Sequence, residues 1–80
     1  MSKKREIEFR LKLGARIKEL RNNRGITQSK LALMVNSGQA HIHRIEAGKT
    51  SVGIDRIVKI SDALDVSVKD LLSFEDLNPS

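Results

Sequence analysis

The sequence contains no cysteine, which excludes a disulfide framework, a thiolate metal site and a thiol nucleophile. Its only aromatic residues are Phe9 and Phe74, so any core must be aliphatic. No apolar run approaches the ~20 residues of a membrane span. The N-terminal stretch MSKKREIEF also lacks the apolar segment of a signal peptide. We therefore expect a soluble protein of the reducing cytoplasm.

The 80 residues predict one small domain, and the charges are unevenly distributed along it. Residues 1–24 carry a balance of +6 and residues 25–50 carry +2, whereas residues 51–80 carry −3. A basic first half suggests an anionic partner on one side of the molecule. A merely solvated basic surface is the alternative.

Apolar spacing predicts a helix over residues 13–24, which Gly25 ends. The preceding segment, residues 6–12, alternates polar and apolar side chains and fits a strand as well as a helix. We treat residues 1–6 as a basic arm that need not be ordered, residues 7–74 as the domain and residues 75–80 as a tail.

Capping residues mark off the remaining helices. Thr27 is a suitable N-cap for a second helix, and Asn36 tolerates the left-handed conformation that ends one. A third helix is predicted from Gln39 to Ala47, a fourth over residues 54–64, and a fifth that opens with a capping box at Ser67 and Asp70. Five short helices with brief connections predict a compact all-α domain.

The third helix holds both histidines, but their spacing argues against metal binding. At 100° per residue, His41 and His43 point about 200° apart, and the chain offers no cysteine or third histidine. No nucleophile–base pattern is visible either, so we predict neither a metal site nor an enzyme.

The same helix presents a surface suited to reading DNA. Ile42 and Ile45 point toward the core, and an opposite face combines small and polar residues: Gln39, Ala40, His43 and Arg44. Glutamine can bond adenine N6 and N7, arginine can bond guanine O6 and N7, and alanine lets a helix approach closely in the major groove.

Residues 25–49 read GITQSKLALMVNSGQAHIHRIEAGK. This stretch resembles the helix-turn-helix of the lambda-repressor and Cro family, also called the XRE family. The flanking segments LGARIKELR and IDRIVKISDALDV agree with it, so the resemblance covers about residues 13–72. It implies a five-helix lambda-repressor-like domain whose second and third helices form the DNA-binding motif.

The resemblance also implies roles for individual residues. Base contacts are expected from Gln39, Ala40, His43 and Arg44. Phosphate contacts are expected from Gln28, Lys49 and Thr50. Arg21 and Glu46 match a salt bridge between the first helix and the end of the third.

Several positions depart from the family pattern. Lys30 stands where the family often has glutamate, which removes a capping box but suits a nearby phosphate. Gly38 replaces a Ser or Thr cap, and His43 is unusual on the reading face, so base specificity does not transfer. His41 is either a phosphate contact or an idle flank residue. Arg16 is expected on a solvated basic face.

We accordingly expect a regulator of transcription that binds double-stranded DNA, most simply a repressor. It would act as a homodimer on a palindromic operator with half-sites about 34 Å apart. The candidate dimer surface is Val68, Leu72 and Phe74, and the rival surface is Ile7 with Leu11. No cofactor or small-molecule effector is expected. A restriction–modification controller and an antitoxin are alternatives, and a protein-interaction module without DNA binding is a remoter one.

Overall fold

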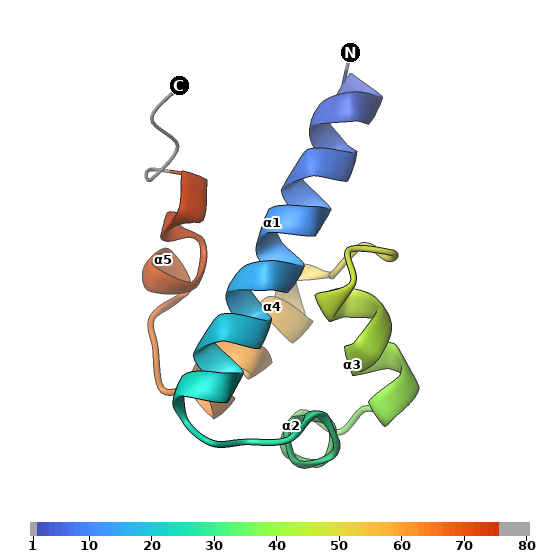
Figure 1. Cartoon of the computed structure of the whole chain (residues 1–80). Helices are drawn as coiled ribbons and strands as arrows, with labels where there is room; N and C mark the ends of the chain where they lie inside the picture. Colours follow the sequence, from blue (N-terminus) through green and yellow to red (C-terminus); the bar gives the residue numbers. More distant parts are fainter. Residues whose placement is uncertain (1, 76–80) are drawn as a thin grey trace.

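The computed structural model describes residues 2–75, which form five α-helices and one 3-10 turn and contain no strand (Figure 1). The elements are α1 (Ser2–Asn23), α2 (Gln28–Met34), α3 (Gln39–Glu46), α4 (Ile54–Ala63), α5 (Val68–Leu71) and η1 (Ser73–Glu75). The predicted all-α fold is confirmed.

The first helix is longer than expected. It begins at Ser2 and runs for 22 residues, about 33 Å at 1.5 Å per residue. The ambiguous residues 6–12 are therefore helical, and Lys3, Lys4 and Arg5 lie in the opening turns rather than in an extended arm. Lysine, arginine and glutamate are good helix formers, which explains why the helix continues through them. Within the predicted tail, Glu75 belongs to η1, and residues 76–80 lie outside the described part of the chain.

The predicted N-caps Thr27 and Ser67 accept hydrogen bonds from the first turns of their helices. Thr27 Oγ1 accepts a hydrogen bond from Lys30 N at 3.0 Å, and Ser67 Oγ accepts one from Asp70 N at 2.9 Å. Asn36 adopts the left-handed conformation, with φ of 56°. A second left-handed residue, Asp65 with φ of 58°, follows α4 and was not predicted. Short polar side chains tolerate this conformation better than branched ones do.

An aliphatic core fills the space between the helices. Its buried members come from all five: Leu13, Ile17, Leu31, Ala32, Val35, Ile42, Ile45, Ile60, Leu64 and Leu71. Ile54, the first residue of the predicted fourth helix, lies outside this core and is 79% exposed. It occupies the first position of α4, beyond the turns through which Ile60 and Leu64 reach the core.

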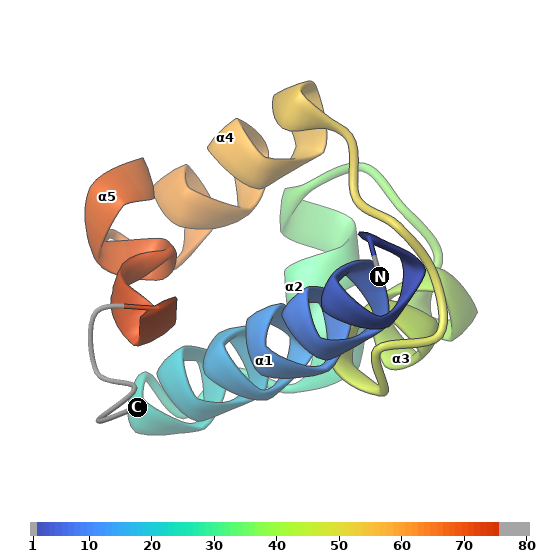
Figure 2. The same ribbon diagram turned by 90° about the horizontal axis from the view of Figure 1, so that it is seen from above.

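Seen from above, α1 and α4 run along opposite edges of the molecule, with α3 near one end and α5 near the other (Figure 2). Arg16 links α1 to the end of α5. Its Nη2 donates to Asp70 O at 3.0 Å and lies 3.5 Å from Ser73 Oγ. The expectation that Arg16 lies on a solvated face is therefore wrong, because its half-buried side chain donates to the Asp70 carbonyl oxygen, which also accepts from Ser73 Oγ at 2.8 Å.

Gly14 allows α1 to lie directly against the end of α3. A Cβ atom at this position would clash with the carbonyl oxygen of Ile45 and would lie 2.6 Å from that of Glu46. Both neighbours are backbone atoms, which cannot move aside without shifting the helix. The short distance between α1 and α3 therefore requires glycine, which has no side chain, at position 14.

We expect Gly14→Ala to lower the free energy of unfolding by about 1–3 kcal/mol, as overpacking does elsewhere. The loss would come from α3 moving away from α1, and denaturant unfolding would measure it. Gly53→Ala is the matched control, because nothing lies within 4 Å of a Cβ there and its φ is −70°. Equal stability of the two variants would contradict the close approach.

Candidate nucleic-acid interface

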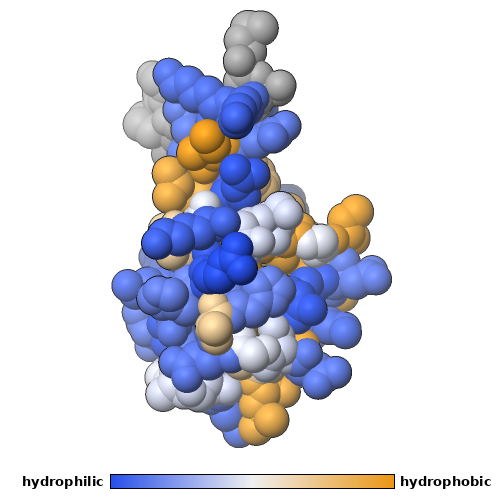
Figure 3. All heavy atoms as spheres, turned by 90° about the vertical axis from the view of Figure 1, so that its right-hand side faces the viewer, coloured by the Kyte–Doolittle hydropathy of each residue, from blue (hydrophilic) through white to orange (hydrophobic). Residues whose placement is uncertain are grey.

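One side of α3 is buried and the other is open to solvent. Ile42 and Ile45 are in the core, and the opposite face exposes Gln39, Ala40, His43 and Arg44. The arrangement expected from helical spacing is thus present. Figure 3 views the molecule from the side on which α3 lies and shows a largely hydrophilic surface, with apolar atoms toward its upper end and edges. Contact of these four residues with bases stays a prediction.

The turn between α2 and α3 is fixed by hydrogen bonds. Ser37 N donates to Ala32 O at 2.8 Å, which closes the end of α2 around the left-handed Asn36. Gly38 caps α3 without a side-chain bond, as expected for glycine. His41 is half-buried, and its Nδ1 lies 3.1 Å from Ser37 Oγ, which anchors the ring to the turn. Its second ring nitrogen, Nε2, is the one that could reach a phosphate.

A hydrogen bond also joins the exposed faces of the two helices. Ser29 Oγ, in the first turn of α2, donates to Gln39 Oε1 at 2.9 Å. Gln39 is the first residue of α3 and a predicted base contact. Ser29 was not singled out from the sequence, because only the angle between the helices brings these side chains together.

The predicted ion pair between Arg21 and Glu46 is present and buried. Arg21 Nε donates to Glu46 Oε2 at 2.6 Å and Arg21 Nη2 donates to Oε1 at 3.0 Å. Arg21 Nη1 donates to Ile26 O at 2.7 Å. The hydrogen bonds that Arg21 donates to Glu46 raise the pKa of its guanidinium, against the lowering effect of burial. The pair connects α1, the segment before α2 and the end of α3.

Gln28 joins this network instead of pointing only outward. Its Nε2 donates to Glu46 Oε1 at 3.0 Å, and the side chain is half-buried. The predicted phosphate contact would therefore use the remaining amide hydrogen. The structure gives Gln28 a second role, which is to satisfy the carboxylate that Arg21 holds.

The loop after α3 is attached to the helix by its backbone. Gly48 has φ of 72°, and Lys49 N donates to Arg44 O at 2.9 Å. The Lys49 side chain is exposed, and Thr50 is half-buried with its hydroxyl directed to Ser51 O at 3.4 Å. The exposed Lys30 lies on α2. The position of Lys49 is therefore fixed relative to the exposed face of α3.

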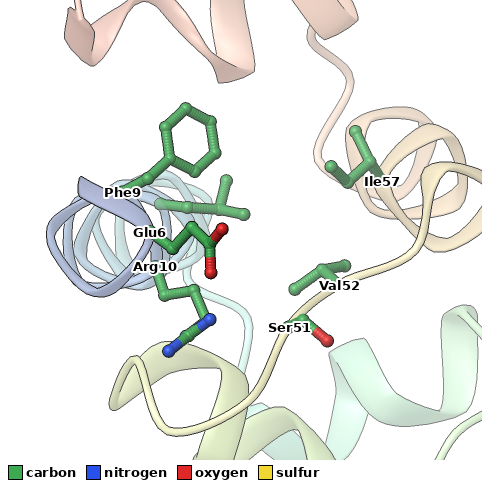
Figure 4. A pocket seen from close by; sticks show the side chains of 7 residues that line it. Glu6, Phe9, Arg10, Ser51, Val52 and Ile57 are labelled. Atoms are coloured by element: carbon green, nitrogen blue, oxygen red, sulfur yellow. The ribbon is translucent and has the colours of Figure 1, made fainter. Parts of the chain in front are cut away.

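No group of three or more potential metal ligands occurs among residues 2–75, and none of the helices in that range is both long and apolar enough to cross a bilayer. A hollow of about 300 Å³ lies between α1, the segment around Val52 and α4. Its wall includes Phe9 and Ile57, with the charged side chains of Glu6 and Arg10 on the α1 side (Figure 4).

Comparison with known proteins gives a consistent result. Residues 17–71 match the family model described as helix-turn-helix, HTH_3. Control protein C.BamHI of Bacillus amyloliquefaciens is 39% identical over 67 residues, which is 82% of this chain and 83% of that protein.

Solved structures are similar as well. The restriction-modification controller protein C.AhdI of Aeromonas hydrophila superposes with a TM-score of 0.78 at 29% identity, covering 81% of this chain and 94% of that one. The clp gene regulator ClgR of Corynebacterium glutamicum gives a TM-score of 0.82 at 25% identity, covering 90% and 94% of the two chains.

We expect Arg21→Ala to lower the free energy of unfolding by about 3–5 kcal/mol, because it leaves the Glu46 carboxylate buried without its cation. Thermal or denaturant unfolding would measure the change. Arg24→Ala is the control, since Arg24 and Asp65 form an exposed pair at 3.7 Å, worth at most ~1 kcal/mol. A similar cost for both substitutions would show that the pair at Glu46 has no special weight.

Proposed function

The chain belongs to the helix-turn-helix family HTH_3, and on that premise we propose that it is a sequence-specific regulator of transcription that binds double-stranded DNA through α3. The observation that carries the proposal is the exposed face of α3. Gln39 and Arg44 flank the small Ala40 there, and no acidic side chain lies among residues 39–44. Both polar side chains can make paired hydrogen bonds to base edges in the major groove.

Phosphate contacts in this proposal surround the reading face. Lys30 on α2 and Lys49 after α3 are exposed cations that would bind the DNA backbone on either side of the groove. Gln28, His41 and Thr50 would add hydrogen bonds to phosphates. These contacts fix the orientation of α3 without carrying sequence information.

We assign the protein a homodimeric state on a palindromic or partly palindromic operator. One recognition helix contacts few base pairs, and two helices about 34 Å apart would read successive major grooves on one side of the duplex. Binding accounts for the proposed activity by itself, with no catalytic step, cofactor or small-molecule effector. It would take place at the nucleoid in the bacterial cytoplasm, whether the gene is bacterial or phage-encoded.

The dimer surface that we propose lies mainly on α4. Of the dimer residues predicted from the sequence, Val68 is exposed, whereas Leu72 and Phe74 pack against the core. The Phe74 ring lies 5.2 Å from that of Phe9 at an interplanar angle of 61°. In contrast, Ile54 and Val58 are exposed one turn apart on α4. This helix runs along the edge of the molecule opposite α1 (Figure 2), so a second copy can approach it.

A narrower role is favoured by two relatives. One is named a control protein and the other a restriction-modification controller protein. We propose that this chain also controls a restriction–modification system, in preference to simple repression of an unrelated gene. The observation that tests this role is whether its gene lies beside endonuclease and methyltransferase genes and whether the protein binds the DNA upstream of them.

The DNA-binding function is tested by selection from random duplexes at near-physiological salt, followed by sequencing. We expect a two-fold symmetric motif with fixed half-site spacing. A pool without enrichment would mean that the basic half of the chain only attracts polyanions, and the proposal would then fail.

Arg44→Ala and Lys49→Ala should have different effects on binding. Loss of a bidentate base contact should cost about 1–3 kcal/mol and relax the preference at one base position. Loss of a phosphate contact should weaken all duplexes alike and reduce the dependence of log K on log salt by about one. Affinity titrations over a set of single-base operator variants and salt concentrations would measure both. A uniform loss for Arg44→Ala would contradict its role as a base contact.

Ile54→Asp should convert the free protein to a monomer, because it would place a charge in the proposed interface. The fold should be retained, because the Ile54 side chain is exposed. Sedimentation equilibrium would report the association state. Leu33→Asp is the matched control, since Leu33 is 75% exposed on α2 and is not part of the proposed surface on α4. If Leu33→Asp dissociates the dimer and Ile54→Asp does not, the interface is misplaced.

A further inference from the structure

Gln39 is held by a partner that the DNA-binding proposal does not use. Ser29 is exposed on α2, and its hydroxyl donates a hydrogen bond to Gln39 Oε1 at 2.9 Å. The preceding residue, Gln28, donates to Glu46 and not to Gln39. We propose that Ser29 is a specificity-determining positioning residue, which touches no base and sets which atoms of the Gln39 amide face the groove. This inference rests on the proposed function, because it concerns base reading by α3.

The hydrogen bond removes a freedom that would otherwise weaken base reading. An unrestrained glutamine loses substantial rotamer entropy when it is ordered on a base, and its amide can present either the oxygen or the nitrogen. Gln39 is exposed at the first position of α3, where Gly38 supplies no side-chain cap. A restraint from the neighbouring helix orders the side chain before DNA arrives, so less entropy is lost on binding.

The donor in this bond decides what Gln39 offers. Because Ser29 donates to Oε1, that oxygen is partly satisfied and the Nε2 amino group is left free. Base edges that carry acceptors are then favoured, namely the N7 of purines, O6 of guanine and O4 of thymine. A cytosine edge, which offers an amino donor to the major groove, is disfavoured opposite an amino group.

The position of Ser29 is itself determined by the core. Leu31 and Ala32 bury the inner face of α2, and Ile42 buries that of α3, so the two helices meet at a fixed angle. The turn bond from Ser37 N to Ala32 O maintains the same geometry. Ser29 and Gln39 therefore meet on the outer side of a rigid helix pair. Folding of this pair does not depend on either of the two side chains.

The inference is tested by repeating the random-duplex selection with Ser29→Ala. Alanine is the better helix former and position 29 is exposed, so the fold should be retained. We expect the preference at one base pair in each half-site to fall about three- to tenfold, the range that one neutral hydrogen bond supports. Preferences at the other positions should not change. Ser29→Thr keeps the hydroxyl and should therefore retain the wild-type preference at this base pair.

A double-mutant cycle with Gln39→Ala separates this role from a direct contact. If Ser29 acts through Gln39, then Ser29→Ala should change neither affinity nor base preference once Gln39 is alanine. A uniform loss of affinity for all duplexes, retained in the Gln39→Ala background, would show that Ser29 binds phosphate and would overturn the inference. An unchanged selection profile for Ser29→Ala would overturn it too. Failure of the wild-type protein to enrich any motif would instead refute the proposed function.

Discussion

The buried contact between Arg21 and Glu46 is the constraint on which the reading surface depends. It fixes the end of α3 to α1 through two hydrogen bonds, and further bonds reach Ile26 O and the Gln28 amide. Removing two charges from water is costly, so such a pair is tolerated only where its geometry is good and its remaining polar atoms are bonded. Here both conditions hold. The pair's main consequence is geometric, because it holds α3 at one angle to the rest of the domain.

Close backbone packing complements this electrostatic constraint. The missing side chain of Gly14 brings α1 against the carbonyl groups at the end of α3, and the apolar face of α3 fills the core from the same side. The left-handed Asn36 then reverses the chain between α2 and α3 in very few residues. These contacts and the ion pair hold the same helix, and its polar face remains exposed to solvent.

In the proposed function, DNA binding and dimerisation use different parts of the molecule. DNA would be read by α3 and the loop after it, where Arg44 and Lys49 are linked through a backbone hydrogen bond. Two copies would associate through α4, the helix along the opposite edge from α1 (Figure 2). The restriction-modification controller protein C.AhdI has a similar fold, with a TM-score of 0.78.

The sequence by itself determined the local features of this protein. Thr27, Asn36 and Ser67 act on backbone groups within a few residues, and apolar spacing identified Ile42 and Ile45 as the inner face of α3. The pair of Arg21 and Glu46 was also foreseen, but only through a family resemblance, since nothing local joins residues 25 positions apart.

The tertiary structure decided the features that depend on how helices meet. Helical spacing assigns a side chain to a face of its own helix, but it does not say what lies opposite. Arg16 bonds the end of α5 and Ser29 bonds Gln39, because the fold brings these residues together. Ile54 remains exposed, because the fold does not bury it. The angle and separation of the helices supply that information, and they follow from the packing of the whole core rather than from any short stretch of residues.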